Sequence, residues 1–115
     1  MVFNVSTVVS SKKIVVLTKN GCKYCDQMKE VLEKELGIDM EQYVRVENLQ
    51  EPKEKFVQKA EEMIKLTGSK TFPQLFLGGK YFGGTDDLRR MQVFNQDKLH
   101  ERFADIGVNI DVVDF

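Results

Sequence analysis

Hydrophobic and polar positions follow one another along the chain in short segments that predict alternating strands and helices. The β-branched, apolar run KKIVVLT at residues 12–18 predicts a buried strand. Apolar residues then recur at helical spacing from Tyr24 to Leu36, and Gly37 is suited to end that helix. YVRVE at residues 43–47 predicts a second strand. A strand, helix and strand in this length favour a right-handed crossover between two parallel strands.

The pattern after the second strand predicts a helix and then a β-hairpin. Pro52 stands where a helix can begin, and Gly68 is suited to end it. The apolar face of this helix is expected to comprise Phe56, Ala60, Met63 and Ile64. PQLFLGGKYFGG at residues 73–84 predicts two short strands joined by a two-residue turn at Gly78–Gly79.

Two further helices complete the predicted order. Thr85 is the expected N-cap of the first, with Asp86 and Asp87 in its opening turn. Its inward side chains are expected to be Leu88, Met91 and Phe94. A short last helix is expected over residues 97–103. The order strand, helix, strand, helix, hairpin, helix predicts an α/β protein with a small mixed sheet.

Composition narrows the class of protein. The chain has 115 residues, enough for one domain, and a net charge of -1 gives no reason to expect nucleic acid or an anionic membrane as a partner. No apolar run approaches the roughly 18–20 residues of a membrane span. The N-terminus has neither a basic start nor a long apolar stretch, so we expect no secretory signal and a cytoplasmic location. In that reducing compartment, neighbouring cysteines are more often catalytic or metal-binding than structural.

The two cysteines, Cys22 and Cys25, lie in NGCKYC at the start of the first predicted helix. Unpaired backbone N–H groups and the helix dipole favour a thiolate there, and Lys19, with help from Lys23, adds positive charge. We therefore expect the pKa of Cys22 to lie below that of an ordinary thiol. Cys25, one turn deeper, is suited to resolve a mixed disulfide that Cys22 has formed.

The cysteine pair alone leaves three interpretations, of which a redox pair is favoured over half a metal site and over inert cysteines. A four-ligand zinc site lacks ligands, because His100 is the single histidine. Carboxylates or a second chain would have to complete it.

A second stretch makes the redox interpretation more specific. TKNGCKYC at residues 18–25, together with KLTGSKTFPQLFLGGKYFGGTDDL at residues 65–88, resembles the dithiol glutaredoxin family. The resemblance covers roughly residues 13–95 and implies a thioredoxin-like fold, with a small mixed four-stranded sheet flanked by helices. It implies one domain over residues 1–115, with a core at about 13–103 and a C-terminal extension at 104–115.

The resemblance implies a glutathione site with Cys22 as nucleophile and Cys25 as resolving thiol. Thr71, Phe72 and Pro73 match the family's cis-proline segment, in which the backbone of the residue at Phe72 pairs with the cysteinyl unit of glutathione.

The two ends of glutathione would be bound by different residues. Thr85 and Asp86 match the helix start that binds the γ-glutamyl end. Lys19, with Lys70 as a second candidate, would pair with the glycyl carboxylate, and Tyr24 would lie beside the sulfur.

The chain departs from the family pattern in three places. Lys23 replaces the small residue or proline frequent between the cysteines. Ala60 stands where many relatives carry a long polar residue, so that contact is not carried over. Residues 104–115 continue past the usual last helix, and their near-alternating apolar positions predict an extra strand or an ordered tail. Those positions are Val108, Ile110 and Val112.

The leading hypothesis is a glutathione-dependent thiol–disulfide oxidoreductase that reduces protein–glutathione mixed disulfides and protein disulfides. We expect a monomer, and by resemblance ribonucleotide reductase is a candidate client. One alternative is a redoxin reduced by a flavoprotein reductase. The other is a carrier in which Cys22 from two chains and two glutathiones hold a [2Fe–2S] cluster.

Overall fold

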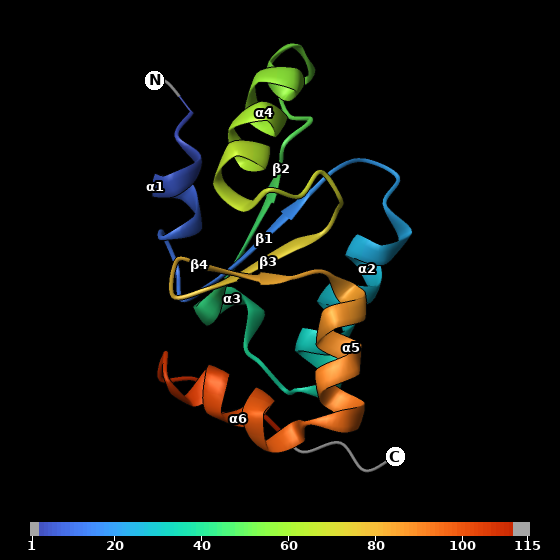
Figure 1. Cartoon of the computed structure of the whole chain (residues 1–115), viewed down its shortest axis with the longest axis vertical. Coiled ribbons are helices and arrows are strands. Elements are labelled where there is room, and N and C mark those ends of the chain that lie inside the picture. The colour runs from blue at the N-terminus through green and yellow to red at the C-terminus, as the bar shows by residue number, and fades with distance from the viewer. Residues whose placement is uncertain (1–2, 112–115) are drawn as a thin grey trace.

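The structure, a computed structural model that describes residues 3–111, contains a four-stranded mixed sheet with helices on both faces (Figure 1). The strand order across the sheet is β2-β1-β3-β4. The strands are β1 Ile14–Thr18, β2 Val44–Asn48, β3 Gln74–Leu77 and β4 Lys80–Gly83. β1 is parallel to β2 and antiparallel to β3, which in turn is antiparallel to β4. The α/β class, the parallel crossover and the hairpin predicted from the sequence are confirmed.

Helices connect and cover the strands. Their bounds are α1 Val5–Val9, α2 Lys23–Glu30, α3 Met40–Tyr43, α4 Phe56–Thr67, α5 Thr85–Phe94 and α6 Gln96–Ala104. α2 continues as π-helical turns over Val31–Glu35, and a 3-10 turn, Lys53–Lys55, precedes α4. The sequence analysis missed α1 and α3, because a helix of four or five residues is too short to show a helical period. Within residues 3–111 no helix combines the length and hydrophobicity needed to cross a membrane.

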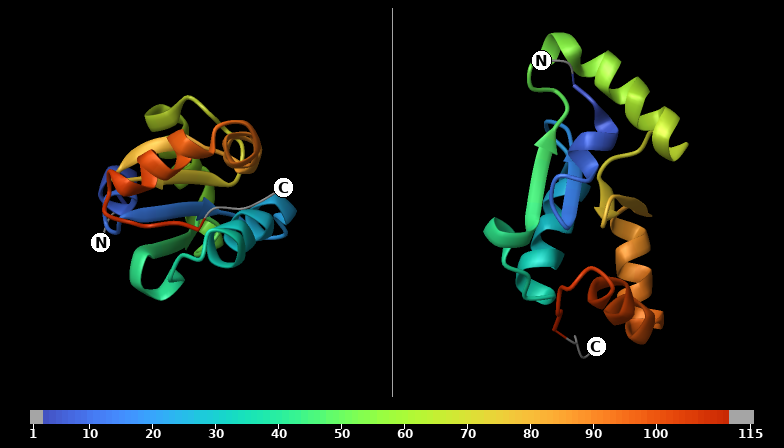
Figure 2. Two further views of the ribbon diagram at one scale, coloured as in Figure 1. Left: turned by 90° about the horizontal axis from the view of Figure 1, so that it is seen from below. Right: turned by 90° about the vertical axis from the view of Figure 1, so that its left-hand side faces the viewer.

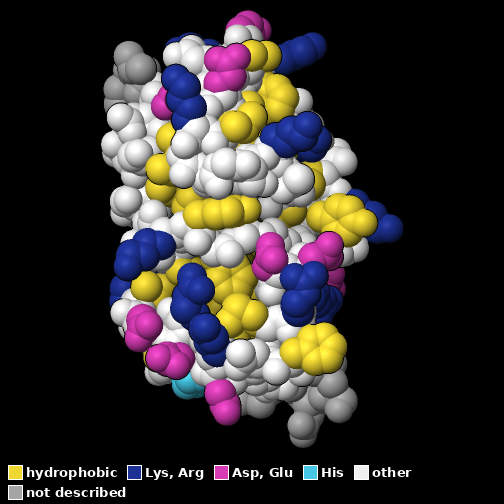
Figure 3. All heavy atoms as spheres, viewed as in Figure 1, with side chains coloured by type: hydrophobic (Ala, Val, Ile, Leu, Met, Phe, Trp, Pro, Cys, Tyr) yellow, Lys and Arg dark blue, Asp and Glu magenta, His cyan; other side chains and the backbone are white. Residues whose placement is uncertain are grey.

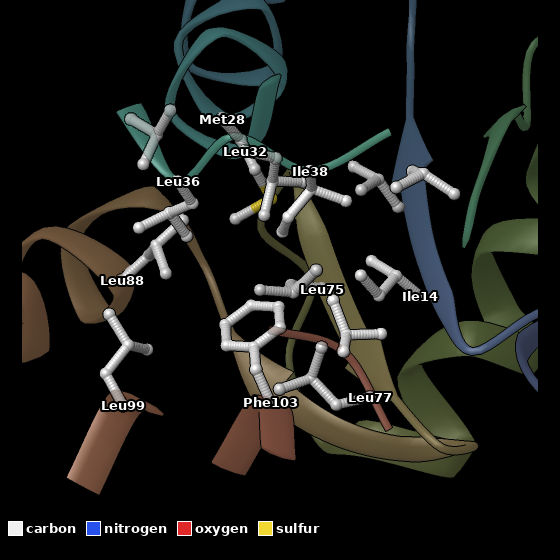
Figure 4. Packing of buried hydrophobic residues seen from close by; sticks show 14 residues of the cluster. Ile14, Met28, Leu32, Leu36, Ile38, Leu75, Leu77, Leu88, Leu99 and Phe103 are labelled. Carbon is white, nitrogen blue, oxygen red and sulfur yellow. The ribbon is translucent and has the colours of Figure 1, made fainter. Parts of the chain in front are cut away.

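Alternation of side chains along β1 and β3 divides the core between the two faces of the sheet. On one face, Ile14 and Leu75 pack with side chains from α2, α5 and α6, which Figure 4 shows converging on the strands. On the other face, Val15 and Phe76 pack with side chains from α1 and α4. Met28 in α2 is fully buried in the first cluster, so packing holds the helix that carries the cysteines against the sheet.

Two predicted core positions are wrong. Phe94 is 83% exposed because α5 ends there and the chain turns at Asn95 into α6, leaving the ring uncovered. Ile64 is 40% exposed, whereas Lys59 in the same helix is buried. The packed side of α4 is therefore the one that carries Lys59 and Met63, one turn apart.

The segment after α6 is an ordered tail and forms no strand within residues 105–111. Val108 is buried in the larger core cluster. The backbone N–H of Asp111 donates to the carbonyl of Leu36 at 2.9 Å. The ordered-tail alternative is therefore confirmed for this part, while Val112, the last of the three alternating positions, lies outside the described residues.

Candidate active site around a cysteine pair

The cysteine pair lies where β1 leads into α2. Cys22 is the N-cap of α2 and forms a disulfide with Cys25, the two Cα atoms being 5.2 Å apart. The backbone N–H of Cys25 donates to the sulfur of Cys22 at 3.2 Å. Cys22 is half-buried, whereas Cys25 is 2% exposed. The sulfur of Cys22 can therefore be approached from outside, and a helix N-terminus favours negative charge on it once the disulfide is reduced.

The start of α5 is tied directly to the start of α2. Gly84, not Thr85, is the N-cap of α5, so the predicted cap is wrong by one residue. The reason is that the backbone N–H of Gly84 already donates to Asp87 Oδ2 at 2.8 Å. The buried hydroxyl of Thr85 instead donates to the carbonyl of Tyr24 at 2.8 Å. This hydrogen bond fixes the first turns of the two helices relative to each other.

A cavity of about 420 Å³ opens between these two helix starts and the segment that precedes β3. Six of the predicted site residues line it: Tyr24, Thr71, Phe72, Pro73, Thr85 and Asp86. Its volume is in the range of small-molecule sites. The fold thus brings together three stretches that are far apart in the sequence.

The segment before β3 presents free backbone groups to this cavity. The Phe72–Pro73 peptide bond is cis, as the resemblance implied. The hydroxyls of Ser69 and Thr71 lie 2.9 Å apart, and Gln74 Nε2 donates to the carbonyl of Ser69 at 2.8 Å, which holds the segment in place. In the described part of the chain, no hydrogen bond engages the backbone N–H or C=O of Phe72. An extended peptide can pair with these groups in the manner of an added strand.

Of the predicted charged residues Asp86 and Lys19, Asp86 lines the cavity, whereas Lys19 does not line it and instead contacts the ring of Phe72. The exposed Lys19 places its Nζ 5.6 Å from the centroid of the Phe72 ring. On the α5 side, Asp86 is exposed and its carboxylate has no partner among residues 3–111. Figure 3 shows acidic side chains at the start of α5 beside a hydrophobic side chain at the start of α2.

Backbone donors add to the α5 side. The N–H groups of Thr85 and Asp86 make no hydrogen bond within the described residues. Lys70 is exposed and does not line the cavity, so its predicted role stays a prediction.

The sequence analysis missed four residues that also line the cavity: Ser69, Tyr81, Gly84 and Asp87. An aspartate three residues after a glycine has the spacing of a capping box, in which the acidic side chain accepts from the backbone N–H of the N-cap residue. This spacing could have identified Asp87 from the sequence. Tyr81 left no such signal, because an aromatic residue in a strand is ordinary. Its place depends on contact with Phe76, whose ring centroid lies 5.5 Å away.

The described residues do not form a metal centre within one chain. Among them, no three His, Cys, Asp or Glu side chains lie close enough together to hold a metal ion. The two cysteines are joined to each other instead. The arrangement is chemically suited to exchange of thiols and disulfides at Cys22.

Comparison with known proteins agrees with this chemistry. A model of the glutaredoxin family matches residues 14–82. Glutaredoxin 1 of Rickettsia prowazekii is 38% identical over 90 residues, which cover 76% of this chain and 86% of the relative. Glutaredoxin 3 of Escherichia coli K12 is 33% identical over 75 residues, covering 65% of this chain and 80% of the relative.

Solved structures extend the likeness to the fold. The holo form of glutaredoxin C1 from Populus tremula x tremuloides superposes with a TM-score of 0.75 at 27% identity, covering 90% of this chain and 94% of that one. A buckwheat glutaredoxin–glutathione complex gives a TM-score of 0.72 at 26% identity, covering 89% and 86%. The sheet and its flanking helices are therefore those of the thioredoxin-like fold that the sequence resemblance implied.

Proposed function

This chain belongs to the glutaredoxin family and is a thiol–disulfide oxidoreductase, and we propose that glutathione is its electron donor. Its substrates in this proposal are protein–glutathione mixed disulfides and protein disulfides. The observation that carries the proposal is the backbone of Phe72, which makes no hydrogen bond within residues 3–111. The Phe72 ring contacts Lys19, and Phe72 lines the same cavity as Asp86. Neither charged side chain forms an ion pair within those residues.

Glutathione complements each of these groups. It is an extended tripeptide with a carboxylate at each end and an ammonium group at the γ-glutamyl end. Its cysteinyl unit would pair with the backbone of Phe72. The γ-glutamyl carboxylate would accept from the free N–H groups of Thr85 and Asp86, and the ammonium group would meet the Asp86 side chain. Lys19, with Lys70 as the second candidate, would bind the glycyl carboxylate. The buckwheat relative, whose structure is a complex with glutathione, supports glutathione as the ligand.

The proposed reaction begins at Cys22 after the disulfide has been reduced. The Cys22 thiolate attacks the glutathione sulfur of a protein–glutathione mixed disulfide. A new S–S bond forms between Cys22 and glutathione, and the client cysteine leaves as a thiolate that takes up a proton. A second glutathione thiolate then attacks the glutathione sulfur on Cys22. This step releases oxidised glutathione and restores the Cys22 thiolate. The net reaction converts the client–glutathione disulfide and one free glutathione into the client thiol and oxidised glutathione.

Cys25 provides the second route, which is needed for disulfides between protein cysteines. Cys22 attacks such a disulfide and becomes joined to the client. The Cys25 thiolate then attacks the Cys22 sulfur, releasing the client as a dithiol and forming the Cys22–Cys25 disulfide. Two glutathione thiols then reduce this disulfide and leave as one molecule of oxidised glutathione. The burial of Cys25 supports this division of labour, because a buried thiol is shielded from a client disulfide but lies next to the Cys22 sulfur.

The test is glutathione-dependent reduction of a small glutathione mixed disulfide, coupled to glutathione reductase and NADPH. Wild type is compared with Cys22→Ser and Cys25→Ser, which are matched changes of one sulfur to oxygen. We expect turnover in wild type and in Cys25→Ser, and none in Cys22→Ser. Absence of turnover in folded wild type would refute glutathione as donor, and loss of deglutathionylation in folded Cys25→Ser would refute the assignment of roles.

The same samples address the alternatives from the sequence. A redoxin fed by a flavoprotein reductase would turn over with that reductase and without glutathione. A [2Fe–2S] carrier would need Cys22 from two chains together with two glutathiones, since residues 3–111 of one chain hold no cluster of three or more ligating side chains. Anaerobic reconstitution followed by absorption spectroscopy and sizing tests it, and a colourless monomer rejects it. By resemblance we propose a cytoplasmic monomer with ribonucleotide reductase as the first client to assay.

A further inference from the structure

A second cavity of about 420 Å³ lies on the opposite side of the sheet from α2, α5 and α6, and the proposed reaction does not use it. It is bounded by α1, by β2 and by the start of α4. In the right-hand view of Figure 2, α1 lies between β2 and α4. The lining residues are Phe3, Asn4, Thr7, Val8, Arg45, Glu47, Pro52, Lys55 and Lys59. This volume is sufficient for a small organic molecule.

The notable side chain in this cavity is Lys59, which is only 5% exposed. Its Nζ donates to the carbonyl of Glu51 at 2.9 Å and lies 4.8 Å from the centroid of the Phe3 ring. Within residues 3–111 no carboxylate forms an ion pair with it. A buried ammonium group carries a desolvation cost that a carbonyl and an aromatic face offset in part. Lys59 therefore retains unused donors and lacks a full counter-charge.

The remaining charges of the cavity add to this imbalance. Arg45 and Lys55 line it, and Glu47 is the one acidic residue in the lining. The Glu47 carboxylate is already paired with Arg45, at 3.2 Å. Lys55, like Lys59, has no carboxylate partner among the described residues. Two lysines thus remain uncompensated at one cavity.

Apolar surface forms the rest of the wall. Phe3 and Pro52 line the same cavity as the two lysines, and Val8 contributes a buried side chain from α1. A ligand that fits must therefore combine a negative group with an apolar body. Inorganic ions satisfy the first requirement alone, and neutral apolar molecules satisfy the second alone.

We propose that this cavity is a second binding site, which takes a small organic anion with a phosphate or carboxylate group on an apolar, preferably aromatic, body. The anionic group pairs with Lys59 and Lys55. The apolar body packs against Phe3 and Pro52. The ligand supplies the counter-charge that the fold leaves out.

The test uses phenyl phosphate and benzoate as probes, with inorganic phosphate and benzyl alcohol as partial mimics, in buffer free of other phosphates. Thermal unfolding and backbone NMR shifts are followed during titration, without any turnover assay, so the result is independent of the proposed function. We expect a saturable rise in Tm with at least one aromatic anion, and NMR shifts concentrated in α1, β2 and the start of α4. The two partial mimics should give much smaller responses. Which aromatic anion binds more tightly distinguishes a phosphate from a carboxylate ligand.

Lysine variants test whether the probes bind at this cavity. Lys59→Met keeps an unbranched side chain, one atom shorter, and removes the charge. Lys53→Met makes the same change at an exposed lysine that does not line the cavity. We expect Lys59→Met to lose the response and Lys53→Met to keep it. Lys55→Ala, at an exposed position, should weaken binding several-fold and serves if Lys59→Met fails to fold. No response in wild type, an equal response in wild type and Lys59→Met, or shifts confined to the cavity beside the cysteines would overturn the proposal.

Discussion

Asp86 and Asp87 are adjacent and exposed in the first turn of α5, yet the structure gives them different tasks. Asp87 Oδ2 accepts from the Gly84 N–H at 2.8 Å, and Asp87 Oδ1 lies 3.6 Å from Arg90. Asp86 has no such partner among the described residues and is free to meet the ammonium group of glutathione. Replacing each by alanine in turn should therefore separate ligand binding from helix capping. Each change takes the net charge from -1 to 0, so each is the control for the other.

The expected loss of stability is larger for Asp87→Ala. Losing the capping hydrogen bond costs about 1 kcal/mol, and the exposed pair with Arg90 adds roughly 0.3 kcal/mol. Both variants lose about 0.3–0.5 kcal/mol of interaction with the helix dipole. The Tm of Asp87→Ala should therefore fall by about 4–8 °C, and that of Asp86→Ala by about 2 °C or less.

The expected loss of glutathione binding is larger for Asp86→Ala. An exposed ion pair contributes about 0.5–1 kcal/mol, which corresponds to a roughly two- to fivefold rise in the KM for glutathione. We expect kcat to stay close to wild type, because Asp86 does not touch the reacting sulfurs in the proposed pose. The coupled mixed-disulfide assay gives both constants, and thermal unfolding of the same preparations gives the stability.

The Tm and the KM for glutathione, measured for each of the two variants, test whether Asp87 caps the helix and Asp86 binds glutathione. Reduced stability in Asp87→Ala with raised KM in Asp86→Ala supports the assignment of tasks. Equal loss of Tm in the two variants would contradict the capping role of Asp87. An unchanged KM in Asp86→Ala would contradict its contact with glutathione.

Two further predictions concern packing. Thr85→Val keeps the shape of the side chain but leaves the Tyr24 carbonyl without its donor, so urea unfolding should show a loss of about 1–2 kcal/mol. A midpoint equal to that of wild type would show that the bond contributes nothing. Leu88→Ala, in α5 and fully buried, should cost about 2–5 kcal/mol. Phe94→Ser, in the same helix and 83% exposed, should stay within about 0.5 kcal/mol of wild type. Similar losses in these two variants would contradict the observed burial.

Several features of the site could be predicted from the sequence, because they depend on residues that are neighbours in the chain. A buried β-branched run followed by a glycine and a helical period places Cys22 at a helix N-terminus, and the structure agrees. The turn at Gly78–Gly79 requires positive φ at both positions, which glycine adopts without strain, and their φ angles are 58° and 81°.

Other features depend on where distant segments meet. From the sequence, the hydroxyl of Thr85 is expected to cap its own helix. In the folded chain it donates a hydrogen bond to the carbonyl of Tyr24 in α2 instead, because that carbonyl lies within reach. Phe94 follows the helical period of α5 and is nevertheless 83% exposed, because among residues 3–111 no helix or strand covers it at the end of that helix. Periodicity identifies the apolar side of a helix but does not show whether another element covers it.

The sequence by itself determined the order of the four strands and the longer helices, the hairpin turn at two glycines and the cysteine pair at a helix start. These features depend on steric and hydrogen-bonding preferences over a few residues, whereas the two shortest helices, α1 and α3, left no such pattern. The tertiary structure decided which charges are left without partners. Lys59 reads as an ordinary surface lysine in a charged helix, yet the packing of α1 against α4 buries it without a carboxylate partner among the described residues. Burial and charge balance arise from contacts between segments far apart in the chain, so they appear once the chain has folded.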